Sequence, residues 1–451
     1  MKKVVLLNSS FVTKRKDMVQ NTKPHLRIGI ANLAACLLKD DIEVVILDPQ
    51  LEKWKIDELV DNVAEEQADV LGLPAYTEEI YDAHNIASKV KERDPGLLTV
   101  LGGHQITALP KETMAECPAV DVGVVGEGET AFRHIVAGKD LSEINGIVYR
   151  ENEKNIIVNP PPVDYESLDD LPFPAWHLYD LKRYHDEMPI EPLRGCPYDC
   201  VFCFRSLGTR VRYKSPQRIL DEIEYNINVL GCRKFAFKCG TFPLAKKHAR
   251  EVFNGILERG LKFSWVASTR IDVLDEEIIQ LMKDTGCVDV SLGIESGDAE
   301  MLKQCGKNTT PEKAETALKL FKKAGMKSVE MNFILGLPGE TKESLLRTKR
   351  FALKMAPYSS RVNFAILTAF PATRVYEMAL CNEAGLSLKS TDWRDYGKQA
   401  GLSLRHANFD DKELVKFQLN CYLSYYLRSP RKIIKLFSID RFVGLLKKFL
   451  V

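Results

Sequence analysis

Three cysteines, Cys196, Cys200 and Cys203, lie within one short segment of the chain. Their spacing suits thiolates that hold three irons of a 4Fe-4S cube and leave the fourth iron without a protein ligand, because cysteine thiolates are the usual ligands of such clusters. An open iron can bind a small chelating molecule, so the cluster would be a reagent as well as an electron carrier. The alternative is a structural zinc knot, but zinc needs a fourth ligand and commonly pairs its cysteines as CxxC. No second CxxC occurs in the chain, so the spacing favours iron and sulfur.

The composition limits the classes of protein that the chain can belong to. Its 451 residues are enough for two or three domains. Lys and Arg (63) nearly balance Asp and Glu (62), so no overall basic field indicates a nucleic-acid partner, and we expect none. The chain has 11 cysteines in all; the number is odd and those outside the trio are scattered, which is a poor disulfide framework. The first apolar run, Val4 to Leu7, is too short for a signal peptide or a membrane span. We expect a cytoplasmic, reducing setting.

The first 140 residues alternate short apolar runs with helical patterns, which predicts a parallel sheet wrapped by helices. Ligands bind beyond the carboxyl ends of strands in such sheets, so the loops there share one rim. Two of these loops, Gly102-Gly103-His104 and Gly126-Glu127-Gly128-Glu129, contain glycines that let the backbone approach a bulky ligand. Ordinary tight turns are the alternative. The expected strands are Val4–Leu7, Glu43–Leu47, Val70–Leu73, Leu98–Leu101 and Val122–Val125.

Proline-rich stretches at 159–162 and 171–174 mark an extended linker, since proline and the residue before it both resist helix. Beyond the linker, six strand–helix repeats fit a partial barrel, whose active site would lie where the strands end. The cysteine trio follows the first of these strands. The expected strands are Ile190–Leu193, Lys234–Phe237, Phe263–Ser268, Val288–Leu292, Val329–Ile334 and Arg361–Leu367, with helices such as Pro216–Val229 and Asp275–Thr285 between them.

From about residue 385 the strand pattern stops, and residues 411–427 have a helical pattern. Residues 429–451 form a basic amphipathic segment in which lysines alternate with large apolar residues. Such a helix either lies on a membrane surface as a peripheral contact or docks on the barrel as a lid. We favour docking.

A CxxxCxxC loop after the first strand of a partial barrel resembles the radical S-adenosylmethionine (SAM) superfamily. The Rossmann-like domain before the barrel resembles the cobalamin-binding module of one large branch. The implied α/β fold has a Rossmann-like cobalamin-binding domain (1–140), a linker (141–184), a partial TIM-like (β/α)6 barrel (185–384) and a helical C-terminal extension (385–451). The motifs that carry the resemblance are, in order, Ile28 to Ala35, Leu71-Gly72-Leu73, Gly102 to His104, Gly126 to Glu129, the cysteine trio, Thr269 to Asp272, Leu292 to Gly297 and Gly336 to Glu340.

The resemblance implies that the open iron chelates SAM and that one electron from the cluster cleaves SAM to a 5′-deoxyadenosyl radical. That radical then takes a hydrogen atom from an unactivated C–H group. The implied SAM contacts are Phe202, Gly336 and Pro338 for the adenine, Arg270 for the carboxylate as a fork donor, and Glu295 and Ser296 for the ribose hydroxyls. Each of these contacts has a structural alternative. Arg270 would instead form a salt bridge with Asp272 or Glu295, Glu295 would cap the next helix, and Gly336 to Gly339 would be only a turn.

Two departures from the branch concern the ligands. The branch often carries two acids after the second barrel strand, where this chain has Cys239 and Gly240. Cys239 is either a buried inert thiol, which we favour, or a catalytic hydrogen-atom donor or extra cluster ligand. The histidine motif Asp-x-His-x-x-Gly of cobalt-ligating proteins is missing after Leu7, and we reject the similar run at Asp82 to Ala87, which we expect within a helix. A cobalamin pocket without histidine ligation would be lined by Tyr76, Thr77, Gly102, Gly103, His104, Gly126, Glu127 and Gly128.

The leading prediction is a cobalamin-dependent radical SAM enzyme that methylates an unactivated carbon, or a phosphinate phosphorus, of a small molecule or lipid. The second is a radical SAM enzyme that closes a ring, oxidises or rearranges carbon without methyl transfer. A third, from another class, is a non-catalytic iron–sulfur electron carrier or cobalamin sensor. The resemblance also implies a flavodoxin- or ferredoxin-type electron donor.

Overall fold

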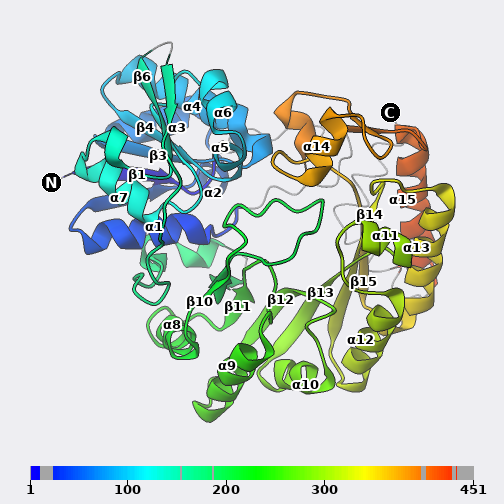
Figure 1. The fold of residues 1–451 in the computed structure, drawn as a ribbon. Helices are drawn as coiled ribbons and strands as arrows, with labels where there is room; N and C mark the ends of the chain where they lie inside the picture. Colours follow the sequence, from blue (N-terminus) through cyan, green and yellow to red (C-terminus); the bar gives the residue numbers. More distant parts are fainter. Residues whose placement is uncertain are drawn as a thin grey trace. The chain divides into compact units, whose positions relative to one another are not determined.

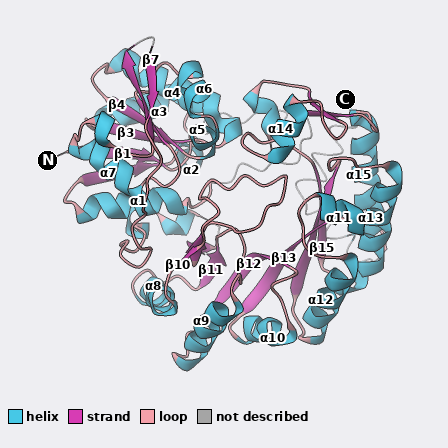
Figure 2. Cartoon of the chain, viewed as in Figure 1, coloured by secondary structure: helices cyan, strands magenta, loops and turns pink. Residues whose placement is uncertain are grey.

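The computed structural model describes residues 2–10, 24–152, 155–184, 187–397, 403–428 and 433. They divide into two compact units, coloured along the sequence in Figure 1 and by secondary structure in Figure 2. The first unit contains the described residues up to 184 and the short segment 205–208, and the second contains 187–204 and the described residues from 209 onward. No helix among these residues is long and apolar enough to cross a membrane.

The first unit is built on a seven-stranded sheet in the order β2-β1-β3-β4-β5-β6-β7. The five strands predicted from the sequence are confirmed, and they are parallel, whereas β6 and β7 add an antiparallel edge. The strands are β1 (Lys3–Leu7), β2 (Glu43–Leu47), β3 (Val70–Pro74), β4 (Leu98–Gly102), β5 (Val122–Val124), β6 (Ile147–Asn152) and β7 (Asn155–Val158). The helices are α1 (Ile28–Lys39), α2 (Pro49–Glu52), α3 (Ile56–Glu65), α4 (Ile80–Arg93), α5 (His104–Ala108), α6 (Pro110–Glu116) and α7 (Glu129–Ala137).

Burial on both faces explains why the strands of the first unit are continuous apolar runs. Val4, Val5, Leu6 and Leu7 are all 1% exposed or less. The sheet and its helices meet so closely that a Cβ atom at Gly72 would lie 2.5 Å from Leu6 Cδ2. Asp82 and His84 lie within α4, as expected.

The second unit contains a six-stranded parallel sheet in the order β15-β14-β13-β12-β11-β8, with helices between the strands, so the predicted partial barrel is confirmed. Several of its helices begin at N-cap side chains that accept a hydrogen bond from the backbone three residues later, at Ser215, Asp275, Thr310 and Thr341. The strands are β8 (Met188–Ile190), β11 (Lys234–Phe237), β12 (Ser264–Arg270), β13 (Cys287–Glu295), β14 (Ser328–Leu335) and β15 (Arg361–Ile366). The helices are α8 (Pro216–Asn228), α9 (Lys246–Glu258), α10 (Glu276–Asp284), α11 (Ala299–Gln304), α12 (Pro311–Lys323), α13 (Lys342–Met355) and α14 (Arg374–Leu380).

The first barrel strand differs from its predicted bounds. The sequence predicts one strand over Ile190–Leu193, but β8 ends at Ile190 and a separate two-residue strand, β9 (Leu193–Arg194), pairs antiparallel with β10 (Arg212–Tyr213). Pro192 lies between them and has no N–H to donate to a sheet. The cysteine segment therefore follows a short hairpin ladder rather than the barrel strand itself.

The C-terminal extension also differs from the prediction, because it is not purely helical. Two strands of three residues, β16 (Leu386–Leu388) and β17 (Leu404–His406), pair antiparallel. Strands this short show no alternation that a sequence pattern could reveal. The predicted helix is confirmed as α15 (Asp411–Tyr426). Of the basic amphipathic segment 429–451, only residue 433 lies within the described residues, so its prediction as a surface or lid helix is untested.

Helix α15 lies alongside β15, the edge strand of the sheet (Figure 1). An edge strand presents unpaired backbone groups. Here Tyr422 Oη accepts the N–H of Phe364 at 3.0 Å, and Gln418 Nε2 donates to the carbonyl of the same residue at 2.6 Å. Tyr426 Oη accepts the N–H of Val362 at 3.4 Å. The helix therefore supplies the hydrogen bonds that another strand would make.

Candidate active site

The cysteine segment is anchored by two glycines. Gly195 has φ +84°, and a Cβ atom there would lie 2.3 Å from the carbonyl oxygen of Arg210, so only glycine fits before Cys196. A Cβ atom at Gly306 would lie 2.3 Å from the carbonyl oxygen of Asp199. The carbonyl of Cys305 also accepts the N–H of Val201 at 3.2 Å. The segment after α11 thus holds the cysteine loop in place.

The three cysteines are free thiols, of which Cys196 and Cys200 are half-buried and Cys203 is exposed. Within the described residues, no three His, Cys, Asp or Glu side chains form a site for a single metal ion. Each thiolate of an iron–sulfur cube binds a different iron, so its ligands stand further apart than those of one ion. Three unpaired thiols on one anchored loop are a donor set that fits such a cluster.

Arg270, at the end of β12, lies beside the cysteines. Its guanidinium makes a two-pronged ion pair with Asp272, with N–O distances of 2.9 and 3.0 Å, and its Nη1 lies 3.3 Å from Cys200 Sγ. The ring of Tyr198 lies 3.6 Å from the guanidinium carbon. Of the alternatives left open by the sequence, the salt bridge to Asp272 is the one observed. The contact with Cys200 still puts this positive charge next to the predicted cluster.

Glu295, at the end of β13, is held in an unusual conformation. It is a non-glycine residue at φ +67°, beside a register shift between β13 and β14. Such strain persists where the surroundings fix it, and it often accompanies function. Its carboxylate pairs with buried Lys307 at 2.8 Å, and a Cβ atom at Gly293 would lie 2.5 Å from Glu295 Oε1. Sequence reasoning did not find Lys307, because nothing in the local pattern pairs it with a residue twelve positions earlier.

Ser296 is fully buried and serves the start of α11. Its Oγ lies 3.0 Å from Thr348 Oγ1 and accepts the N–H of Asp298 at 3.1 Å. Asp298 then caps α11 by accepting the N–H of Met301 at 3.1 Å. This side chain therefore fixes the backbone that follows Glu295.

The loop after β14 runs from Gly336 to Glu340. The backbone N–H groups of Gly336 and Leu337 both donate to Glu340 Oε2, at 2.6 and 3.0 Å. Glu340 is 2% exposed, and burial raises the pKa of its carboxyl group to about 7. Pro338 stands at the tip between two glycines of positive φ, Gly336 (+83°) and Gly339 (+74°). The shape of the loop is thus fixed by one buried carboxyl group.

Cys239 and Gly240 lie against the first cluster cysteine. A Cβ atom at Gly240 would be 3.2 Å from Cys196 Cβ and 3.7 Å from its sulfur, so a larger residue would crowd that cysteine. Cys239 is half-buried, and burial raises the pKa of its thiol well above the usual range. A protonated thiol at this place is compatible with an inert role or with a hydrogen-atom donor.

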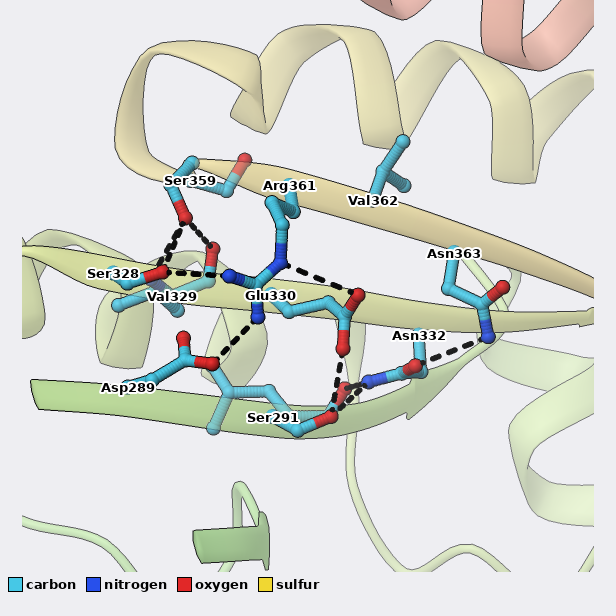
Figure 3. Close-up of polar contacts among 12 residues, drawn as sticks. Asp289, Ser291, Ser328, Val329, Glu330, Asn332, Ser359, Arg361, Val362 and Asn363 are labelled. Carbon is cyan, nitrogen blue, oxygen red and sulfur yellow. Dashed lines mark hydrogen bonds and ion pairs between the residues drawn. The ribbon is translucent and has the colours of Figure 1, made fainter. Parts of the chain in front are cut away.

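The inner face of β13, β14 and β15 carries a polar network (Figure 3). Asn363 Nδ2 donates to Asn332 Oδ1 at 3.2 Å, Asn332 Nδ2 donates to Ser291 Oγ at 2.8 Å, and Ser291 Oγ donates to Glu330 at 3.1 Å. At the end of the network, Arg361 forms ion pairs with Glu330 and Asp289. Barrel interiors are usually filled by branched apolar side chains, so this wall favours a polar ligand over a packed core.

In the first unit, the loops after β1, β3 and β4 share the predicted rim. Arg27 pairs with Glu79 at 2.5 Å and donates to Ser9 Oγ at 3.0 Å. Its guanidinium lies 4.8 Å from the ring centre of Tyr76, and Tyr76 in turn lies 4.9 Å from the ring of His104. Burial, reinforced by the charge of Arg27, lowers the pKa of His104. Sequence reasoning found Tyr76 and His104 but not the buried ion pair that supports them.

Two glycines of the same rim border open space. A Cβ atom at Gly102 would meet nothing within 4 Å, and one at Gly126 would meet only Tyr165 Oη, at 3.9 Å. Gln105, 1% exposed, has both amide atoms buried without a hydrogen-bond partner in the described structure. Buried amides normally have partners, so this amide and the open glycines fit a ligand rich in amide groups, as cobalamin is. The remaining predicted residues of the rim are Thr77, Glu127 and Gly128, of which Thr77 is buried.

Two family descriptions match the chain, the radical SAM superfamily over residues 190–352 and the B12 binding domain over residues 21–136. An uncharacterized methyltransferase of Pyrococcus horikoshii is 33% identical over 444 residues, which cover 96% of this chain and 94% of that protein. The chain belongs to the B12-binding branch of the radical SAM superfamily.

This radical SAM protein has further relatives. The anaerobic magnesium-protoporphyrin IX monomethyl ester cyclase of Rubrivivax gelatinosus is 28% identical over 78% of this chain and 65% of that protein. The fold is similar to that of the radical SAM methyltransferase TsrM from Kitasatospora setae, with a TM-score of 0.75 and 18% identity over 95% of this chain and 90% of that one. The predicted fold and family are thereby confirmed. The chain is a radical SAM enzyme, and its cofactors are a 4Fe-4S cluster, SAM and cobalamin.

Proposed function

We propose that this enzyme transfers a methyl group to an unactivated carbon, or a phosphinate phosphorus, of a small-molecule substrate. The observation that carries the proposal is the near full-length similarity to a methyltransferase, at 33% identity. When bound, the cluster and SAM supply a 5′-deoxyadenosyl radical that activates the substrate, and cobalamin supplies the methyl group. Holding the reacting groups in one site lowers the barrier, because their encounter no longer costs translational freedom.

For the cluster and SAM, the proposed assignment follows the contacts in the second unit. Cys196, Cys200 and Cys203 hold three irons. Arg270 places its charge beside Cys200 (3.3 Å), where it favours the thiolate and the SAM carboxylate. Glu295 is paired with Lys307 and presents a fixed carboxylate to the ribose. The other proposed SAM contacts are Phe202, Ser296, Gly336 and Pro338.

For cobalamin, we propose the rim of the first unit. Tyr76, Thr77, Gly102, Gly103, His104, Gly126, Glu127 and Gly128 line it, and the open positions at Gly102 and Gly126 support this assignment. We further propose a flavodoxin- or ferredoxin-type electron donor and a cytoplasmic location. The basic segment 429–451 would dock as a lid or contact a membrane surface.

A second candidate function is radical cyclisation, oxidation or rearrangement without methyl transfer. The 28% identity to the anaerobic cyclase favours it. The two functions differ in their products, because only methyl transfer converts a second SAM to S-adenosylhomocysteine.

Anaerobic incubation of the reconstituted enzyme with dithionite, SAM and hydroxocobalamin tests the proposal. We expect 5′-deoxyadenosine from reductive cleavage of SAM together with S-adenosylhomocysteine, because reduced cobalamin takes a methyl group from a second SAM. 5′-Deoxyadenosine alone would favour the second candidate. The absence of both products would contradict both candidates. Cys196→Ala, Cys200→Ala and Cys203→Ala should each abolish the brown absorbance near 400 nm and all SAM cleavage, and full activity in any one of them would contradict the cluster assignment.

A further inference from the structure

The loop from Gly336 to Gly339 is enclosed on the side where a side chain of Gly336 would project. A Cβ atom at Gly336 would lie 2.6 Å from Cε1 and 3.0 Å from Nε2 of His406, and 3.1 Å from Cδ2 of Leu414. His406 belongs to β17 and Leu414 to α15. The C-terminal extension therefore fills the back of this loop, and only glycine leaves room for the imidazole ring.

Two hydrogen bonds to backbone groups hold the same loop to the extension. The N–H of Gly339 donates to the carbonyl of Ala384 at 3.0 Å, just before β16. Asn408 Nδ2, just after β17, donates to the carbonyl of Glu340 at 2.8 Å. The β16–β17 hairpin is thus anchored to the end of the loop, at Gly339 and Glu340.

An apolar cluster joins the hairpin to the cysteine segment as well. Leu337 of the loop and Leu404 of β17 are 1% exposed or less and belong to one buried cluster, against which Phe202 packs. Phe202 lies between the second and third cysteines. A displacement of the hairpin would therefore disturb both proposed walls of the adenine site together.

We propose that the β16–β17 hairpin is part of the SAM site and that His406 is a positioning residue, which sets the shape of the Gly336–Gly339 loop against which the adenine binds. This inference rests on the SAM placement proposed above. His406 Nε2 is buried and has no hydrogen-bond partner in the described structure, so the ring acts on the loop by filling space. Removing it leaves a void beside a glycine, and the loop loses its single conformation.

The test uses the full-length enzyme with its cluster reconstituted, and it measures 5′-deoxyadenosine formation with dithionite as reductant and SAM varied. His406→Ala should raise KM for SAM about tenfold, which corresponds to about 1.4 kcal/mol, and leave kcat within about twofold. Asn408→Ala, which removes a different anchor, should raise KM in the same direction. Arg405→Ala is the matched control, because Arg405 is exposed and neighbouring residues of a strand point to opposite faces. Its KM should not change.

A second readout does not depend on turnover. Binding of SAM alters the electron paramagnetic resonance spectrum of the reduced cluster, and His406→Ala should need about tenfold more SAM for the same change. A cluster-replete His406→Ala with unchanged KM and an unchanged spectral titration would overturn the proposal, as would Arg405→Ala with an equal loss. If His406→Ala does not fold, Asn408→Ala decides by the same criteria. Wild-type enzyme that neither binds nor cleaves SAM would instead refute the proposed function.

Discussion

The buried carboxyl group of Glu340 should make the stability of the protein fall as the pH rises toward neutrality. Burial raises the pKa of this group from 4.5 to about 7. Between these values the folded chain keeps a proton that the unfolded chain has lost, so the free energy of unfolding decreases with increasing pH and becomes constant above about pH 8. At about 1.4 kcal/mol per pKa unit, the full effect is about 3 kcal/mol, of which about 2 kcal/mol falls between about pH 5.5 and about pH 8.

Glu340→Gln tests this reasoning. The glutamine oxygen can still accept the N–H groups of Gly336 and Leu337, but the side chain does not ionise. The advantage of the variant in unfolding free energy should therefore grow by about 2 kcal/mol from about pH 5.5 to about pH 8. Denaturant unfolding followed by circular dichroism under anaerobic conditions measures it. Glu343→Gln is the control, since Glu343 is 61% exposed. Parallel pH profiles for wild type and Glu340→Gln would refute the reasoning.

Three further predictions concern single contacts. Lys307→Met should lower the free energy of unfolding by about 3 to 5 kcal/mol, because it leaves the carboxylate of Glu295 buried without its partner. Adding Glu295→Gln should recover most of this loss. If it recovers none, the ion pair is not the cause. Tyr422→Phe should cost about 1 kcal/mol in denaturant unfolding, because a backbone N–H of β15 loses its acceptor; an unchanged midpoint would contradict that role. Gln105→Leu should raise the melting temperature of cobalamin-free protein and lower the amount of cobalamin retained on desalting, since it removes an unpaired amide; unchanged retention would count against Gln105 as a cobalamin contact.

The sequence predicted best those parts of the fold that local pattern controls. Strands covered on both faces are continuous apolar runs, which is why Val4–Leu7 and Val70–Leu73 were recognisable. The cysteine segment was recognisable for a similar reason, since one short loop supplies the whole donor set.

Contacts between distant segments could not be predicted in this way. The ion pairs of Arg27 with Glu79 and of Lys307 with Glu295 depend on tertiary packing. The sequence alone does not show which acidic residue each basic residue will meet. Likewise, β16 and β17 are three residues long and become strands only because they pair with each other. The contact of His406 with Gly336 depends on that pairing, so no local sequence pattern could predict it.

The tyrosines of α15 have a consequence for any shortened form of this enzyme. A chain cut before Asp411 would keep every barrel strand but leave the N–H and C=O groups of Val362 and Phe364 without their present partners. Such a bare ladder recruits extended segments from other molecules. Fragments that stop short of this helix should therefore polymerise, and α15 protects the enzyme from aggregation as well as supporting its structure.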